Sequence, residues 1–311
     1  MNRSALRRIK ANVRFSHTEL HMYDRPGPIL NHGHDIDALL PGEIARRAEI
    51  IGAQKARMEL GSLIVLAILA GAFIGLGAMF ATTVLAGAEG VLPFGVRRLI
   101  AGTVFCLGLI LVVIGGAELF TGNTLMVMAL GAGEIRVGEM LRAWAIVYIG
   151  NFVGAVATAA LVFLAGQHLS GEGAVAAVAL KLASDKVGLP FDRAFFMGIL
   201  CNVLVCLAVW LSIGARTTSD KVLAVLFPVS AFVAAGFEHS VANMYLIPLG
   251  LMIQEWGPEA LVQAARPSGR ILTWPAFLWS LVPVSLGNMI GGGLLVGGVY
   301  WFVYLRPRKG G

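Results

Sequence analysis

The chain has 311 residues, of which 57% are hydrophobic and only 14% are charged. A soluble domain is about half apolar and about one quarter charged, whereas the mean hydropathy here is +0.79. These values exclude a single soluble enzyme domain and a disordered chain. The 39 glycines follow no G-X-Y period, and three cysteines are too few for a disulfide scaffold. A net charge of +6 in such a chain indicates basic loops at a membrane, so no nucleic-acid partner is expected.

A basic, mostly polar arm at 1–59 precedes the first apolar stretch. Within it, 41–59 is predicted to be an amphipathic helix, because Pro41 suits a first turn and Ile44 and Ala48 recur at helical spacing. This helix could lie on the membrane surface, cover a pore mouth or simply be solvated. The arm contains no apolar h-region, so no cleavable signal peptide is expected. No metal site is predicted, although the arm holds four potential ligands: His32, His34, Asp35 and Asp37.

Apolar stretches predict the membrane spans, since a helix needs about 20 apolar residues to cross a bilayer. The stretches without Asp, Glu, Lys or Arg are 60–88, 99–117, 119–133, 143–171, 194–215, 222–237, 239–254 and 271–305. Four are long enough to span alone, and two pairs are each split by a single glutamate, Glu118 or Glu238. The predicted fold class is therefore an all-α membrane protein with six transmembrane helices, of which the second and fifth are broken.

These spans divide the chain into three parts. The arm occupies 1–59, the membrane domain 60–305 with repeat halves at about 60–171 and 194–305, and the tail 306–311. Of the Lys and Arg residues, 17 fall on the side that carries both termini and 7 on the other. The positive-inside rule therefore predicts that both termini are cytoplasmic.

The two broken spans carry the same motif. G-x-E-x-x-x-x-N occurs at 116–123 and again at 236–243, and G-N-x-x-G occurs at 150–154 and 287–291. Two motif pairs in matching order make chance similarity a poor explanation. Because each half holds three spans, the halves must be inverted relative to one another. Inverted repeats with broken helices are a transporter and channel device, and their half-helix N-termini favour anions.

The ionisable residues at the breaks are Glu118, Glu238 and His239. Such groups are costly in lipid and usually face a cavity or a partner. The glutamates, together with Asn123 and Asn243 of the same motif, are predicted to tie down the loops, the carboxylates by accepting backbone N–H bonds. A lone histidine is more often a hydrogen-bonded core residue, but its place at a break favours a functional role in which it exchanges a proton.

Other residues near the breaks could line a pore. Thr121 can donate a hydrogen bond, and Asn202 is an amide within a span that needs partners and could lend one to a substrate. Phe105 and Leu109 share one helical face, and Phe232 leads into the second break. These three residues could form apolar constrictions, although such residues are more often ordinary core.

Long segments resemble the formate/nitrite transporter family, particularly its formate channel branch. The resemblance covers roughly 40–308 and rests on GAELFTGN (116–123), GILCNVLVCLAVW (198–210), FVAAGFEHSVANMYLIP (232–248) and GNMIGGGLLVG (287–297). It implies an aquaporin-like protomer, assembled as a homopentamer in which each protomer has its own pore. It also implies passage of small monovalent anions or their acids: formate, nitrite, hydrosulfide, acetate and lactate.

The family's functional residues transfer onto matching positions of this chain. The resemblance implies that Thr121 and His239 are the pore threonine and histidine, Asn202 the pore asparagine and Lys186 the vestibule lysine. It implies constrictions at Phe105, Leu109 and Phe232.

The expected function is a bidirectional formate channel, or a proton-linked formate transporter (symport), in the cytoplasmic (inner) membrane. No enzyme activity and no cofactor are expected. Desolvation favours a neutral acid over a bare carboxylate, so His239 would donate or relay a proton to formate. In a variant, the anion itself passes while His239 is charged.

A nitrite or hydrosulfide channel of the same family is the alternative. Rival classes fit less well. A water or glycerol pore would be expected to show Asn-Pro-Ala, which the chain lacks. An ammonium pore would be expected to show twin histidines. An intramembrane hydrolase using Ser240 and His239 lacks a third orienting residue, and adjacent side chains face each other poorly.

Overall fold

The computed structural model describes residues 38–265 and 272–307, and within them all regular secondary structure is helical. Six helices are long and apolar enough to cross a membrane: Leu60–Leu85, Phe94–Gly115, Val137–Leu164, Phe191–Gly214, Thr218–Ala235 and Trp274–Leu305. The all-α class and the six predicted spans are therefore confirmed. The four potential metal ligands of the arm, at positions 32–37, lie outside the described residues, as does the end of the tail, 308–311.

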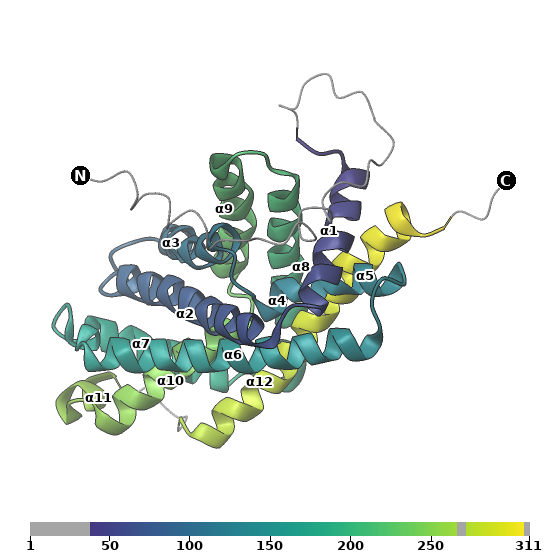
Figure 1. Cartoon of the computed structure of the whole chain (residues 1–311). Coiled ribbons are helices and arrows are strands. Elements are labelled where there is room, and N and C mark those ends of the chain that lie inside the picture. The colour runs from purple at the N-terminus through teal and green to yellow at the C-terminus, as the bar shows by residue number, and fades with distance from the viewer. Residues whose placement is uncertain (1–37, 266–271, 308–311) are drawn as a thin grey trace, which may run out of the picture. The chain divides into compact units, whose positions relative to one another are not determined.

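Four of these helices pack as two backbone-to-backbone pairs (Figure 1). Helix α2 (Leu60–Leu85) packs along α6 (Val137–Leu164), and α8 (Phe191–Gly214) packs along α12 (Trp274–Asn288). A Cβ atom at Gly154 would overlap the carbonyl of Ile68, and one at Gly291 would overlap the carbonyl of Ile199. Small residues at these crossings let the backbones approach closely, as the spacing of the glycines predicts.

The second and fifth apolar segments are each interrupted by a short non-helical stretch. Helix α3 (Phe94–Gly115) ends before Gly116, and α4 (Phe120–Asn123), η3 (Thr124–Met126) and α5 (Val127–Gly131) follow. Helix α9 (Thr218–Ala235) ends before Gly236, and α10 (Ser240–Trp256) follows. The two glycines have φ angles of +76° and +79°, a left-handed conformation that glycine adopts at little cost and that ends a helix.

Helix α1 (Pro41–Ala56) begins at the predicted residue and packs against α5, α8 and the π-helical segment η6 (Trp301–Leu305). Its buried side includes Ile44, Ala45 and Ala48. Helix α1 therefore belongs to the same compact unit as the spans, and this unit begins at Ala38.

Several elements differ from the sequence prediction. The third span begins at Val137 instead of 143, because its first turns contain Glu139 and Arg142, which a charge-free window omits. Between α6 and α8, the short turn η4 (Gln167–Leu169) precedes an unpredicted helix, α7 (Ala174–Val187), which packs against α10 and α11 (Glu259–Ala265). The sixth span changes from α12 to the π-helical segment η5 (Met289–Gly298).

Candidate functional site

Two buried asparagines fix the interruptions in the same way. Asn151 of α6 accepts a hydrogen bond from the Phe120 backbone N–H (2.9 Å) and donates to the carbonyls of Ala67 (2.7 Å) and Glu118 (2.9 Å). It therefore ties the start of α4 and the preceding loop to α2. Two of its bonds satisfy the Phe120 N–H and the Glu118 carbonyl, which the interruption would otherwise leave unpaired, and the third reaches a carbonyl within α2.

Asn288 of α12 does the same for the second interruption. It accepts from the Ser240 backbone N–H (3.0 Å) and donates to the carbonyls of Gly198 (2.8 Å) and Glu238 (3.0 Å). The asparagine of each G-N-x-x-G motif thus has a defined role. No role was predicted for this asparagine, although the repeated G-N-x-x-G motif identifies its position.

The glutamate of the first interruption binds side chains. Lys55 Nζ of α1 lies 3.0 Å from Glu118 Oε2 and 2.8 Å from Asn123 Oδ1, and Asn123 Nδ2 donates to the same carboxylate oxygen at 2.8 Å. The Glu118 side chain is 6% exposed and that of Lys55 26%. A buried carboxylate needs such a counter-ion.

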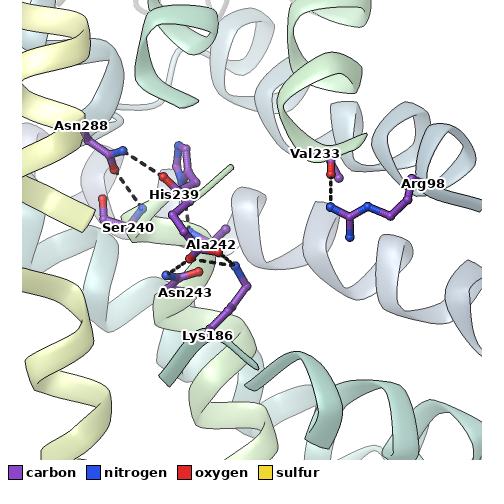
Figure 2. Close-up of polar contacts among 9 residues, drawn as sticks. Arg98, Lys186, Val233, His239, Ser240, Ala242, Asn243 and Asn288 are labelled. Atoms are coloured by element: carbon purple, nitrogen blue, oxygen red, sulfur yellow. Dashed lines mark hydrogen bonds and ion pairs between the residues drawn. The ribbon is translucent and has the colours of Figure 1, made fainter. Parts of the chain in front are cut away.

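The second interruption has an equivalent set (Figure 2). Lys186 of α7 donates to both oxygens of the Glu238 carboxylate (2.9 and 3.0 Å), and Asn243 Nδ2 donates to Oε2 (2.7 Å). In Figure 2 the dashed lines from Lys186 and Asn243 converge on this carboxylate, close to His239. The partners of these two carboxylates among the described residues are thus lysine and asparagine side chains, where the sequence predicts backbone N–H groups. In each set the asparagine follows its glutamate by five residues, and the lysine comes from a helix distant in the chain.

His239 caps the N-terminus of α10. Its Nδ1 accepts a hydrogen bond from the Ala242 backbone N–H at 3.1 Å, and its Nε2 lies 3.0 Å from Thr121 Oγ1. Accepting from Ala242 requires a lone pair on Nδ1, so a neutral ring carries its proton on Nε2 and donates it to Thr121. The threonine hydroxyl proton then remains available for another acceptor. Both side chains are buried, and they join the two interruptions.

Two cavities lie close to this pair, and residues of both repeat halves line each of them. The cavity beside α1 (the α1-side cavity) has a volume of about 470 Å³, and the cavity beside α7 (the α7-side cavity) about 220 Å³. Cationic side chains line the first at Arg47, Lys55, Arg216 and Lys221, and the second at Arg98 and Lys186. Leu119 lines the first cavity and His239 the second.

The three predicted constriction residues line the cavities. Leu109 lines the α1-side cavity, while Phe105, one helical turn away on α3, lines the α7-side cavity together with Phe232. The Phe105 and Phe232 rings meet edge to face with centroids 5.8 Å apart, and Phe232 stacks on His239 at 5.9 Å. Neighbouring turns of α3 therefore contribute apolar side chains to different cavities.

Asn202 lines neither cavity. Its Nδ2 has two hydrogens and lies within hydrogen-bond distance of three acceptors, the Thr121 carbonyl (3.2 Å), Thr124 Oγ1 (3.1 Å) and the Asn288 carbonyl (2.6 Å). This amide holds the Thr121 segment against α12. Lys55 and Arg98 were not predicted as site residues. No sequence motif identifies them, because their partners are distant in the chain.

Comparisons with known proteins agree with this architecture. A family model described as "Formate/nitrite transporter" matches residues 42–302. The formate channel FocA of Escherichia coli K12 is 43% identical over 276 residues, which cover 88% of this chain and 96% of that protein. FocA of Haemophilus influenzae is 38% identical over 264 residues, covering 84% and 93%.

A solved structure described as a pentameric formate channel with formate bound superposes with a TM-score of 0.74 at 39% identity, covering 79% of this chain and 98% of that one. A structure described as an FNT family ion channel gives a TM-score of 0.69 at 33% identity, covering 86% and 98%. Taken together with the six apolar spans, these matches identify the chain as a multi-pass membrane protein that belongs to the formate/nitrite transporter family.

Proposed function

We propose that this chain conducts formate in both directions across the membrane through a pore that joins the two cavities. The similarity to channels named for formate supports this substrate. The cations that line each cavity support attraction of a small anion from either side. The observation that carries the proposal is the buried Thr121–His239 pair, a polar contact beside the Phe232 ring, with His239 at the wall of the α7-side cavity. On this proposal, the pair and the neighbouring apolar side chains form the boundary between the two cavities.

Formate crosses this boundary as the neutral acid. A bare carboxylate would lose its hydration among Phe105, Leu109 and Phe232 at a high cost in free energy, and desolvation favours its protonated form. The Thr121 hydroxyl donates to a formate oxygen while it accepts from His239 Nε2. The proton enters with formate, which makes the passage a symport. A charged His239 would place a proton on Nδ1 against the Ala242 N–H, so the geometry favours this mechanism over passage of the anion beside a charged ring.

Radiolabelled formate uptake into proteoliposomes between pH 5 and pH 8, with His239→Asn as the variant, tests the mechanism. Asparagine can still cap α10, so the variant removes the donor to Thr121 and keeps the helix start. Wild-type uptake should increase as the pH falls. The variant should take up formate more slowly, and the ratio of its uptake rate at pH 5 to that at pH 8 should differ from the wild-type ratio. A variant whose profile matches wild type over the whole range overturns the role of His239.

Leu119→Ala is the matched control. Leu119 occupies the position of the first interruption that corresponds to His239, with an offset of 120 residues, and it lines the other cavity. This substitution should keep the pH ratio of wild type. Nitrite as a competitor addresses the alternative substrate that the family description includes. Nitrite uptake that formate does not inhibit would assign the pore to nitrite.

We further propose a homopentamer in the cytoplasmic (inner) membrane, with both termini cytoplasmic and with a separate pore in each protomer. The similarity to a pentameric channel supports the oligomer, and the excess of Lys and Arg on the side of the termini supports the orientation. Hydrosulfide, acetate and lactate are proposed as further permeants. Mass measurement of the detergent-solubilised protein tests the oligomer, since a monomeric mass would contradict it.

A further inference from the structure

The α7-side cavity is lined by four charged side chains: Arg98, Asp185, Lys186 and Glu238. Two of them neutralise each other, because Lys186 Nζ binds both oxygens of the Glu238 carboxylate at 2.9 and 3.0 Å. Asp185 is paired with Lys181 at 3.2 Å. Among residues 38–265 and 272–307, Arg98 is therefore the cation of this cavity that forms no ion pair with a carboxylate.

Backbone carbonyls hold the Arg98 side chain in place. Its Nε donates to the Ala234 carbonyl at 3.0 Å and its Nη2 donates to the Val233 carbonyl at 2.6 Å, so it binds the last turn of α9 (Figure 2). Carbonyl dipoles at a helix C-terminus favour a cation but do not cancel its charge. A guanidinium has five N–H donors, so three remain for an anion in the cavity.

The guanidinium also lies beside the loop that carries the site. A Cβ atom at Gly236 would lie 2.8 Å from Arg98 Nη2, and Gly236 is followed by Phe237, Glu238 and His239. Arg98 is half-buried, so its field is screened less than that of a surface arginine. The charge is therefore fixed at the wall of the cavity, next to the turn that positions His239.

We infer that Arg98, rather than Lys186, sets the affinity of the α7-side cavity for a small monovalent anion. Lys186 is a positioning residue, because its charge is neutralised by the Glu238 carboxylate. The inference rests on the proposed function, since the anion it concerns is the one that the pore conducts. Removing the Arg98 charge leaves a cavity whose remaining charged side chains are all in ion pairs, and this cavity should no longer concentrate anions.

The experiment measures initial rates of formate uptake into proteoliposomes over a series of formate concentrations at pH 7. Arg98→Gln removes the charge and keeps an N–H donor, and Arg98→Lys keeps the charge. Arg97→Gln is the matched control, because Arg97 is adjacent, pairs with Glu89 at 3.5 Å and lies outside the cavity lining. We expect Arg98→Gln to raise the half-saturating formate concentration by about three- to ten-fold, with a smaller change in maximal rate.

Arg98→Lys should stay within about two-fold of wild type if the charge is what matters, and Arg97→Gln should match wild type. The inference is overturned if Arg98→Gln half-saturates at the wild-type concentration, if Arg98→Lys is as impaired as Arg98→Gln, or if Arg97→Gln gives the same rise. A wild-type protein that takes up nitrite but not formate overturns the proposed substrate alone, and the same variants with nitrite then decide the role of Arg98. Uptake of neither anion overturns both.

Discussion

The two interruptions of the helices share a polar framework and differ in the residue at the tip. Each has a glutamate bound by a lysine and an asparagine. Each is also fixed by an asparagine from a neighbouring span. At equivalent positions, however, the first interruption has Leu119 and the second has His239. The framework is thus present twice, while the histidine occurs once, so the proposed proton chemistry depends on the second half and the framework is common to both.

Asn151→Ala and Asn288→Ala should have the largest effects, and these should be similar. Each substitution leaves two backbone groups of the interruption without this partner and removes a third bond to a neighbouring helix, so the free energy of unfolding should fall by about 3–5 kcal/mol. Unfolding by SDS titration of the detergent-solubilised protein measures this loss. A loss below about 1 kcal/mol in only one variant would show that the two halves do not share a framework.

Gly154→Ala and Gly291→Ala should come next. The added methyl groups meet the carbonyls of Ile68 and Ile199, so the helix pairs must separate, at a cost of about 2–3 kcal/mol. Gly138→Ala in α6 is the control, since a Cβ there meets nothing within 4 Å. The same titration measures all three variants, and a control as unstable as the others would attribute the effect to the loss of glycine itself.

Glu238→Gln and Glu118→Gln should differ from one another. The side chain of Lys186 is 15% exposed and that of Lys55 is 26% exposed, so removal of the carboxylate charge leaves Lys186 the less solvated. We expect losses of about 2–3 kcal/mol for Glu238→Gln and about 1–2 kcal/mol for Glu118→Gln. Adding Lys186→Met to Glu238→Gln should restore part of the lost stability. If it does not, an unpaired Lys186 is not the cause of the loss.

Glu59→Gln should have the smallest effect. Glu59 caps α2, and hydrogen bonds from the backbone N–H groups of Gly61 and Ser62 lower the pKa of its carboxyl group. A lowered folded-state pKa contributes stability above the unfolded pKa that is lost as the pH falls through the folded pKa. The thermal midpoint of the variant should therefore approach that of wild type below about pH 4.

In the second half, α8 follows Pro190 and has no side-chain cap. Pro190→Ala should accordingly show no such pH dependence. A constant difference between Glu59→Gln and wild type from pH 7 downward would contradict the capping role.

The sequence predicts the fold class and the six spans well because both depend on local composition. A run of apolar residues is sufficient to mark a span, and the repeated motif marks Glu118, Glu238 and His239 as central. Helix α7 was missed because its sequence, AVAAVALKLASDKV, combines an apolar face with three charges and lies outside any charge-free window.

The partners of these residues could not be predicted, because they depend on packing between distant segments. Lys55 and Glu118 are 63 residues apart, and Arg98 and Val233 are 135 residues apart. No pattern along the chain predicts which lysine pairs with which carboxylate. The π-helical segment η5 is a further case, since its Gly292 packs against Thr124 and Asn202 of distant segments.

The narrow separation of the two cavities has a consequence for membrane voltage. Leu109 and Phe105 line different cavities and are four residues apart on α3, which corresponds to about 6 Å along a helix axis. Water-filled cavities carry the electrical potential of the solution they open to, so most of the membrane potential would fall across this short apolar layer. A bare anion would have to cross that field, whereas a neutral acid would not sense it, and net flux would then follow the concentration and pH gradients at any membrane potential.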